Sequence, residues 1–237
     1  LQAARAATSQ GAGKAVAAAA CARAGHLAWV CNHVHQGQLV GKVPREEVSD
    51  VHRRHPARLG ETPEAVYIAS AFNAYARTYA ALPGLPLPQG DAAMNCTDFV
   101  YLCLVSTGLL SRATVGEILA AAERGGTWDP VWQSLGFDAS RPIDVRLKPG
   151  DIVFASDAGA FDHAALYVGG GLAAHLSSSS NAGRVALTPL SALPAVTGST
   201  RLTYTPLAEA LRRARLPHGP GRDKPVSWLP GLLPASS

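Results

Sequence analysis

Three side chains in this sequence are of the types that together perform nucleophilic catalysis. Cys96 follows a polar bend and precedes the apolar run from Phe99 to Val105, so the sequence predicts that it begins a helix. The positive end of a helix dipole favours the thiolate form of a cysteine there. A thiol nucleophile needs a nearby base, and the base needs a third group that orients its ring. His163 is the candidate base and His175 the candidate orienting group.

The two histidines fall on opposite arms of an expected β-hairpin. The stretch "HAALYVGGG" reads as a strand that ends at three glycines, and "LAAHLS" reads as the strand that returns. With the glycines midway, His163 and His175 come nearly opposite each other on adjacent strands, within side-chain reach. His163 is then expected to face Cys96 between helix and sheet. The structural alternatives are a buried core cysteine, a surface histidine at a strand end and a half-buried core histidine.

The expected secondary structure changes along the chain from helices to strands. Helices are expected over about 14–35, over 65–82, after Cys96 and over 114–125, whereas residues 1–13 and 83–95 read as irregular. Strands are expected at 152–154, 163–168, 172–177, 183–190 and 200–207, followed by a short helix over 206–215. Helices first and a mostly antiparallel sheet afterwards predict an α+β fold.

In this order and spacing, the motifs resemble the NlpC family of papain-like cysteine peptidases. The matching segments are "NCTDFV" around Cys96, "KPGDIVF", "DHAALYVGGG" and "AAHL", which together span about residues 90–178. The resemblance implies a papain-like fold in which the nucleophile begins a helix packed on an antiparallel sheet. It also implies that Cys96 attacks an amide carbonyl, that His163 is the general base and that His175 is the third member. The backbone N–H of Cys96 would help to hold the oxyanion.

The sequence departs from the family pattern beside the nucleophile. Asn95 stands where the family has Asp, and Asp98 stands where it has Gly, which puts a carboxylate near the expected substrate groove. The upstream Tyr-Gly-Gly segment of the family is missing, and Tyr79 or Tyr75 would have to replace its tyrosine. The candidates for substrate or oxyanion contacts are therefore Thr97, Asp98 and Tyr79.

The resemblance divides the chain and suggests its substrates. We expect an N-terminal helical extension or subdomain at 1–85, a papain-like catalytic core at 86–215 and a Pro/Gly-rich tail at 216–237. The expected function is hydrolysis of peptidoglycan stem peptides as an endopeptidase or amidase, as in a secreted antibacterial effector or toxin domain with an immunity or inhibitor protein as partner. The alternatives are a protein-modifying toxin, a deamidase or acyltransferase with the same triad, and a non-catalytic binding module.

The amino-acid composition argues against several other classes of protein. Among 237 residues, 47% are hydrophobic and 16% charged, which suits a globular chain with a sizeable core. The formal charge of +4 is scattered, which argues against a nucleic-acid partner, and the apolar stretch 15–31 is too short and interrupted for a membrane span. No cofactor or metal is expected, because the cluster Cys31, His33 and His35 lacks a second ligand pair at standard spacing. A Cys21–Cys31 disulfide stays open. No signal peptide is visible, so we expect secretion or delivery to the periplasm or a target cell as part of a larger polypeptide.

Overall fold

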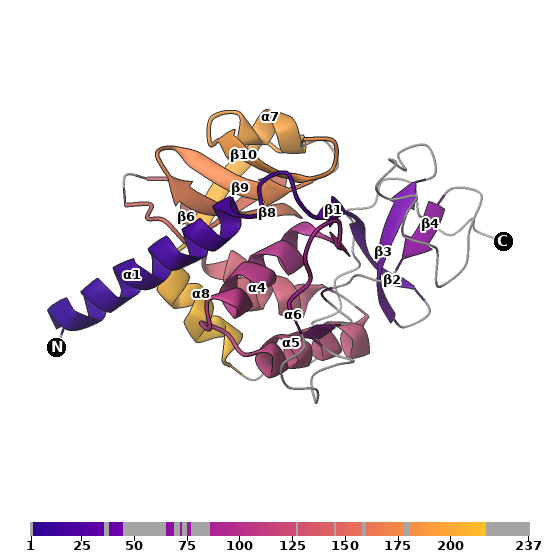
Figure 1. Cartoon of the computed structure of the whole chain (residues 1–237), viewed down its shortest axis with the longest axis horizontal. Helices are drawn as coiled ribbons and strands as arrows, with labels where there is room; N and C mark the ends of the chain where they lie inside the picture. Colours follow the sequence, from indigo (N-terminus) through magenta and orange to yellow (C-terminus); the bar gives the residue numbers. More distant parts are fainter. Residues whose placement is uncertain are drawn as a thin grey trace.

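The protein has an α+β fold in which helices lie on both faces of a six-stranded antiparallel sheet (Figure 1). The computed structural model describes residues 2–35, 38–44, 65–68, 72, 75–76, 86–126, 128–144, 146–157, 160–177 and 181–216. The strand order is β10-β9-β8-β7-β11-β6. These strands are β6 (Arg141–Pro142), β7 (Ile152–Asp157), β8 (Ala160–Gly169), β9 (Leu172–Leu176), β10 (Val185–Pro189) and β11 (Arg201–Thr205). The predicted α+β class and the strands of the second half of the chain are confirmed.

Successive side chains of β8 and β9 point alternately into two hydrophobic clusters, one on each face of the sheet. On one face, Ala164, Leu166 and Ala174 belong to the larger core, into which α4 (Cys96–Ser106) and α1 (Gln2–Cys21) also pack. On the other face, Ala165 and Ala173 belong to a smaller core, which α7 (Leu193–Thr197) covers through Leu193. Figure 1 shows α1 and α4 on one side of the sheet and α7 on the other. The period-two pattern of β8 and β9 reflects this burial on both faces.

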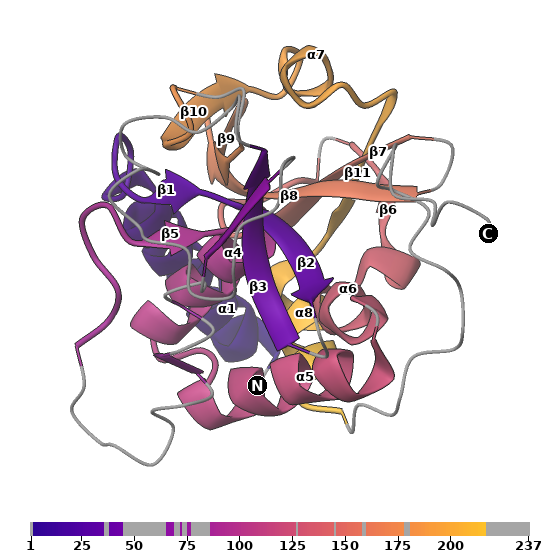
Figure 2. The same cartoon turned by 90° about the vertical axis from the view of Figure 1, so that its right-hand side faces the viewer.

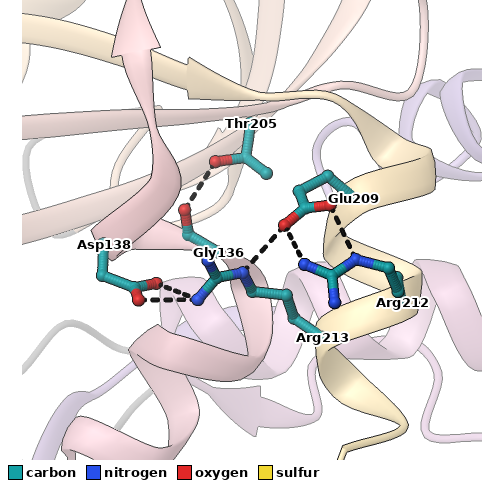
Figure 3. Close-up of polar contacts among 6 residues, drawn as sticks. All are labelled: Gly136, Asp138, Thr205, Glu209, Arg212 and Arg213. Atoms are coloured by element: carbon teal, nitrogen blue, oxygen red, sulfur yellow. Dashed lines mark hydrogen bonds and ion pairs between the residues drawn. The ribbon is translucent and has the colours of Figure 1, made fainter.

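Helices α5 (Arg112–Gly125), α6 (Asp129–Leu135) and α8 (Leu207–Ala214) complete the larger core. α5 and α8 match the predicted helices, whereas α6 and α7 were not predicted. Arg213 of α8 pairs with Asp138 and, within its own helix, with Glu209, and Glu209 also accepts from Arg212 (Figure 3). Thr205 Oγ1 donates to Gly136 O at 2.7 Å, so the end of β11 and the end of α6 are joined. The ion pair between Arg213 and Asp138 ties α8 to the segment that follows α6.

The N-terminal region differs from the predicted helices. α1 begins at Gln2 and ends at Cys21, followed by a turn in which Gly25 adopts φ +78°, so neither the loose start at 1–13 nor a helix to residue 35 is correct. Strands β1 (Ala28–Trp29), β2 (Cys31–His35), β3 (Gln38–Pro44) and β4 (Ala65–Ile68) follow. The antiparallel pairing β2-β3-β4 supplies backbone hydrogen bonds that outweigh the helical periodicity of 65–82 at its first four residues.

α1 meets the sheet at a close contact between two glycines. Gly13 lies against the turn before β7, and a Cβ at Gly13 would collide with the carbonyl oxygen of Pro149. Gly150, at φ +91°, faces Gly13 from the turn, and a Cβ there would lie 2.6 Å from the Gly13 Cα. The "KPGD" motif also fixes this corner, because Asp151 accepts from Lys148 N at 2.8 Å and from Leu207 N, at the start of α8, at 3.0 Å. The N-terminal helix therefore packs on the same core as the sheet.

Candidate active site

Cys96 is the first residue of α4, as the sequence predicted. Asn95 is the N-cap residue, with extended backbone at φ −101° and ψ 179°, and its Oδ1 accepts from Asp98 N at 2.8 Å. The Asn95 carbonyl accepts the first helical bond, from Phe99 N at 3.0 Å. The cap satisfies one of the amide groups that a helix start leaves without a partner inside the helix. Cys96 is 7% exposed and stands at the positive end of α4.

The two residues that depart from the family pattern bond to each other. Asn95 Nδ2 donates to Asp98 Oδ2 at 2.9 Å, and Thr97 Oγ1 donates to Asn95 Oδ1 at 2.7 Å. All three side chains are buried. The Asn95 amide oxygen caps the helix, and the Asp98 carboxylate holds the amide in place by accepting from its Nδ2. Thr97 and Asp98 have a structural role at this helix start, and contact of either with a substrate stays a prediction.

The predicted hairpin brings His163 and His175 together. β8 and β9 pair antiparallel with Ala165 opposite His175, so His163 is the diagonal neighbour of His175 on the same face. His163 Nε2 and His175 Nδ1 are 3.1 Å apart, and the rings meet edge to face at an interplanar angle of 87°. His175 Nε2 lies 2.9 Å from Thr188 Oγ1 of β10. The sequence predicted the histidine pair but not Thr188.

Burial sets the charge of this histidine pair. His163 is 5% exposed and His175 is fully buried. Burial lowers the pKa of His163 well below its usual 6.5, and the neighbouring His175 lowers it further. Burial alone lowers the pKa of His175 to about 4. Both imidazoles are therefore neutral at neutral pH, because desolvation disfavours the charged form.

Cys96 lies at the same end of the sheet as the two histidines. β5 (Ala93–Met94), which leads into Cys96, pairs in parallel with β1, and the two run side by side near α4 in Figure 2. Trp29 N of β1 donates to Gly183 O at 2.8 Å. β10 begins two residues later and pairs with β9 beside His175. This chain of backbone contacts fixes the start of α4 relative to the hairpin.

The histidine pair lies on one face of the sheet, and α4 packs against the other face. His175 shares a face with Ala173 and Thr188, whereas Ala174 and Leu176 point into the larger core with α4. A β-bulge interrupts the pairing of β7 with β8, where Ala155 pairs with His163 but Ser156 pairs with Phe161. Bulges bend a strand and are frequent beside active sites. His163 lies on the same face as Ala165 and His175, so the expectation that it faces Cys96 between the helix and the sheet is wrong. A contact between the Cys96 thiol and His163 stays a prediction.

Of the two candidate tyrosines, the structure describes only Tyr75, and it also describes two free thiols besides Cys96. Tyr79 lies outside the described residues. Tyr75 is buried, with its ring beside Phe72 and the Arg112 guanidinium 5.0 Å from its centroid. Cys21 is exposed and is a free thiol, so it forms no disulfide, whereas burial raises the pKa of Cys103 to about 12.

Within the described ranges, no three His, Cys, Asp or Glu side chains gather in a way that could hold a metal ion. The side chains of Cys31, His33 and His35 lie outside that part. Among the helices that the structure describes, none has the length and apolar character of a membrane span. No model of a known protein family matches the sequence, and no curated protein matches it.

Proposed function

We propose that this protein is a cysteine hydrolase with a papain-like, NlpC-type fold that cleaves amide bonds with Cys96, His163 and His175. The observation that carries the proposal is the 3.1 Å contact between His163 Nε2 and His175 Nδ1, two buried rings at the end of the sheet where Cys96 begins α4. A thiol at a helix start, a base and a group that orients the base are the three parts that such chemistry needs.

The proposal gives each nitrogen of His163 a role. Nε2 contacts His175, so Nδ1 is the nitrogen proposed to take the thiol proton of Cys96. The thiolate sulfur then attacks the amide carbonyl, and the backbone N–H of Cys96 donates to the oxyanion; such a donor is typically worth about 3 kcal/mol of barrier. His163 returns the proton to the leaving amine as the C–N bond breaks. Water, deprotonated by His163, hydrolyses the thioester and restores the thiol.

The neutral state of the histidine pair shapes the first step. A base must be unprotonated to accept the thiol proton, and burial keeps His163 in that form at neutral pH. The helix dipole at Cys96 and the imidazolium formed by transfer both stabilise the thiolate. Activation of Cys96 in this scheme depends on His163, so removing His163 slows every reaction of the thiol.

The proposed substrate is the stem peptide of bacterial peptidoglycan, which is the substrate class that the NlpC-type resemblance implies. The competing substrate is a protein side-chain amide, which the same three residues would deamidate or use for acyl transfer. The missing Tyr-Gly-Gly segment favours this rival, because the family places a tyrosine beside the substrate there.

Iodoacetamide labelling of the native protein against pH, with the modified sites assigned by mass spectrometry, tests the catalytic part. Cys96 should react faster than Cys21 and Cys103, and the His163→Ala variant should lose the advantage of Cys96 while Cys21 keeps its rate. Equal rates at Cys96 in both proteins contradict the proposal.

Digestion of purified cell walls, with Cys96→Ala as the inactive control, tests the substrate. New peptide fragments that appear only with the active protein support stem-peptide hydrolysis. If a reactive Cys96 releases no fragments, then the peptidoglycan assignment is wrong, and ammonia release from protein substrates is the assay that identifies the deamidase alternative.

A further inference from the structure

The hydrogen-bonded chain of the two histidines continues to a hydroxyl group on the third strand of the hairpin sheet. Thr188 lies on β10, two residues beyond Ala186, which is the register partner of His175. Its Oγ1 is 2.9 Å from His175 Nε2, and its side chain is 9% exposed. Threonine is branched at Cβ, so its hydroxyl is held in few rotamers. Both ring nitrogens of His175 are thus engaged, one by His163 and the other by Thr188.

Two arrangements of protons satisfy this chain when both rings are neutral. In the first, His163 Nε2–H donates to His175 Nδ1, and His175 Nε2–H donates to Thr188 Oγ1. In the second, the Thr188 hydroxyl donates to His175 Nε2, and His175 Nδ1–H donates to His163 Nε2. A neutral imidazole carries one N–H, so the first arrangement leaves a lone pair on His163 Nδ1 and the second leaves a proton there. Only the first makes His163 a base toward a thiol.

We propose that Thr188 is a positioning residue whose hydroxyl accepts from His175 Nε2–H and thereby holds His163 as the Nε2–H tautomer. This inference rests on the proposed function of His163 as the base, and it adds a fourth residue that acts through the other two. The proton position on one nitrogen of a histidine is set by the hydrogen bond that the other nitrogen makes. When the Thr188 hydroxyl accepts, His163, two hydrogen bonds further along the chain, carries its proton on Nε2.

Because His163 and His175 are buried, water cannot replace the Thr188 hydroxyl as the partner of His175 Nε2. With valine at position 188, no hydroxyl faces His175 Nε2, and a buried ring N–H without an acceptor is disfavoured. The ring then favours the Nδ1–H tautomer, in which His175 donates to His163 Nε2 and His163 Nδ1 acquires the proton. The substitution changes the volume little, so the expected effect is on proton position and not on the fold.

The matched control is Thr203, a second buried threonine of the same sheet. Its Oγ1 makes no hydrogen bond within the part of the chain that the structure describes, and its side chain is 4% exposed. Thr203→Val removes a buried hydroxyl without touching either histidine. Thr188→Ser keeps the hydroxyl at the position that contacts His175 and is the conservative rescue.

The first readout is the ¹⁵N chemical shifts of the imidazole nitrogens in the full chain, which distinguish the two tautomers directly. In the wild type both histidines should be Nε2–H tautomers. Thr188→Val should move both toward Nδ1–H, whereas Thr188→Ser and Thr203→Val should keep the wild-type pattern. A wild type with the proton on His163 Nδ1, or a Thr188→Val pattern identical to that of Thr203→Val, overturns the inference. The wild-type spectrum alone decides the case if the valine variant does not fold.

The second readout is the rate at which Cys96 reacts with iodoacetamide. Loss of one hydrogen bond in the chain predicts a decrease of roughly three- to tenfold in Thr188→Val, with Thr188→Ser within about twofold of wild type. A tautomer shift without any change in the Cys96 rate shows that His163 does not activate the thiol, which contradicts the proposed function and leaves the role of Thr188 on the tautomer standing. If neither the tautomers nor the Cys96 rate changes in Thr188→Val, then the proposed role of Thr188 is wrong. The proposed function still stands in that case if Cys96 reacts fast and His163→Ala slows it.

Discussion

Acidification should destabilise the folded chain through His175. In the unfolded chain this ring titrates near its usual pKa of 6.5, whereas burial lowers its pKa to about 4 in the folded protein. Between these two values the unfolded state binds more protons than the folded state, so the free energy of unfolding falls as the pH falls. The contribution of His175 is complete above about pH 6.5 and is lost progressively toward about pH 4.

The size of the effect follows from the shift. Since one pKa unit corresponds to about 1.36 kcal/mol, moving from neutral pH to pH 5 should remove about 2 kcal/mol through His175 alone. His163 adds to the loss in the same direction, because burial also lowers its pKa. A single domain is stable by only about 5–15 kcal/mol, so this loss is readily measured.

Urea unfolding of the wild type and of His175→Gln at pH 7.5 and pH 5 provides the assay. The glutamine does not titrate, so the wild type should lose about 2 kcal/mol more than the variant between the two pH values. His26→Gln is the control, because it removes an exposed imidazole and should lose as much as the wild type. Equal losses in the wild type and His175→Gln would refute the neutral, buried state of this ring.

Three further predictions concern the surroundings of the site. Asn95→Asp should destabilise the protein by about 2 kcal/mol in urea unfolding, because it sets a second carboxylate against Asp98, and the double variant with Asp98→Gly should recover most of that loss. Gly13→Ala should cost about 1–3 kcal/mol, because its Cβ collides with the turn before β7, whereas Gly11→Ala in the same helix has open space and should gain about 0.5–1 kcal/mol. Cys103 should resist iodoacetamide at pH 8 in the native protein and react in urea, because burial raises its pKa to about 12; labelling of Cys103 at the rate of an exposed thiol would contradict its burial.

The sequence predicted the parts of the site that have a local signal. Glycines 169–171 mark a turn, and a turn between two short apolar runs determines which residues face each other, so the His163–His175 pair followed directly. A polar residue before an apolar run likewise identified the start of α4 at Cys96. These are short-range relations, in which the residues that matter are close together in the chain.

The missed features depend on contacts between distant segments. Thr188 meets His175 only because β10 pairs with β9 after a loop, and a threonine in a strand carries no signal of its own. The N-cap bond from Asp98 N to Asn95 Oδ1 could have been predicted, because an asparagine directly before a helix is a typical N-cap residue. The helix predicted to residue 35 was wrong because strand pairing of Cys31–His35 with Gln38–Pro44 outweighs the propensity of the alanine-rich segment before it.

The same burial has opposite consequences for the proposed chemistry and for the fold. A base with a lowered pKa stays neutral in weakly acidic solution, so His163 in the folded protein remains able to accept the Cys96 proton below pH 6.5. The fold, however, loses stability over that range, since each buried neutral imidazole is protonated more readily in the unfolded chain. The acid limit of activity is therefore expected to follow unfolding and not the protonation of the base. Replacing His175 by glutamine tests the effect on the fold, because it removes one of the two buried imidazoles whose protonation favours the unfolded chain.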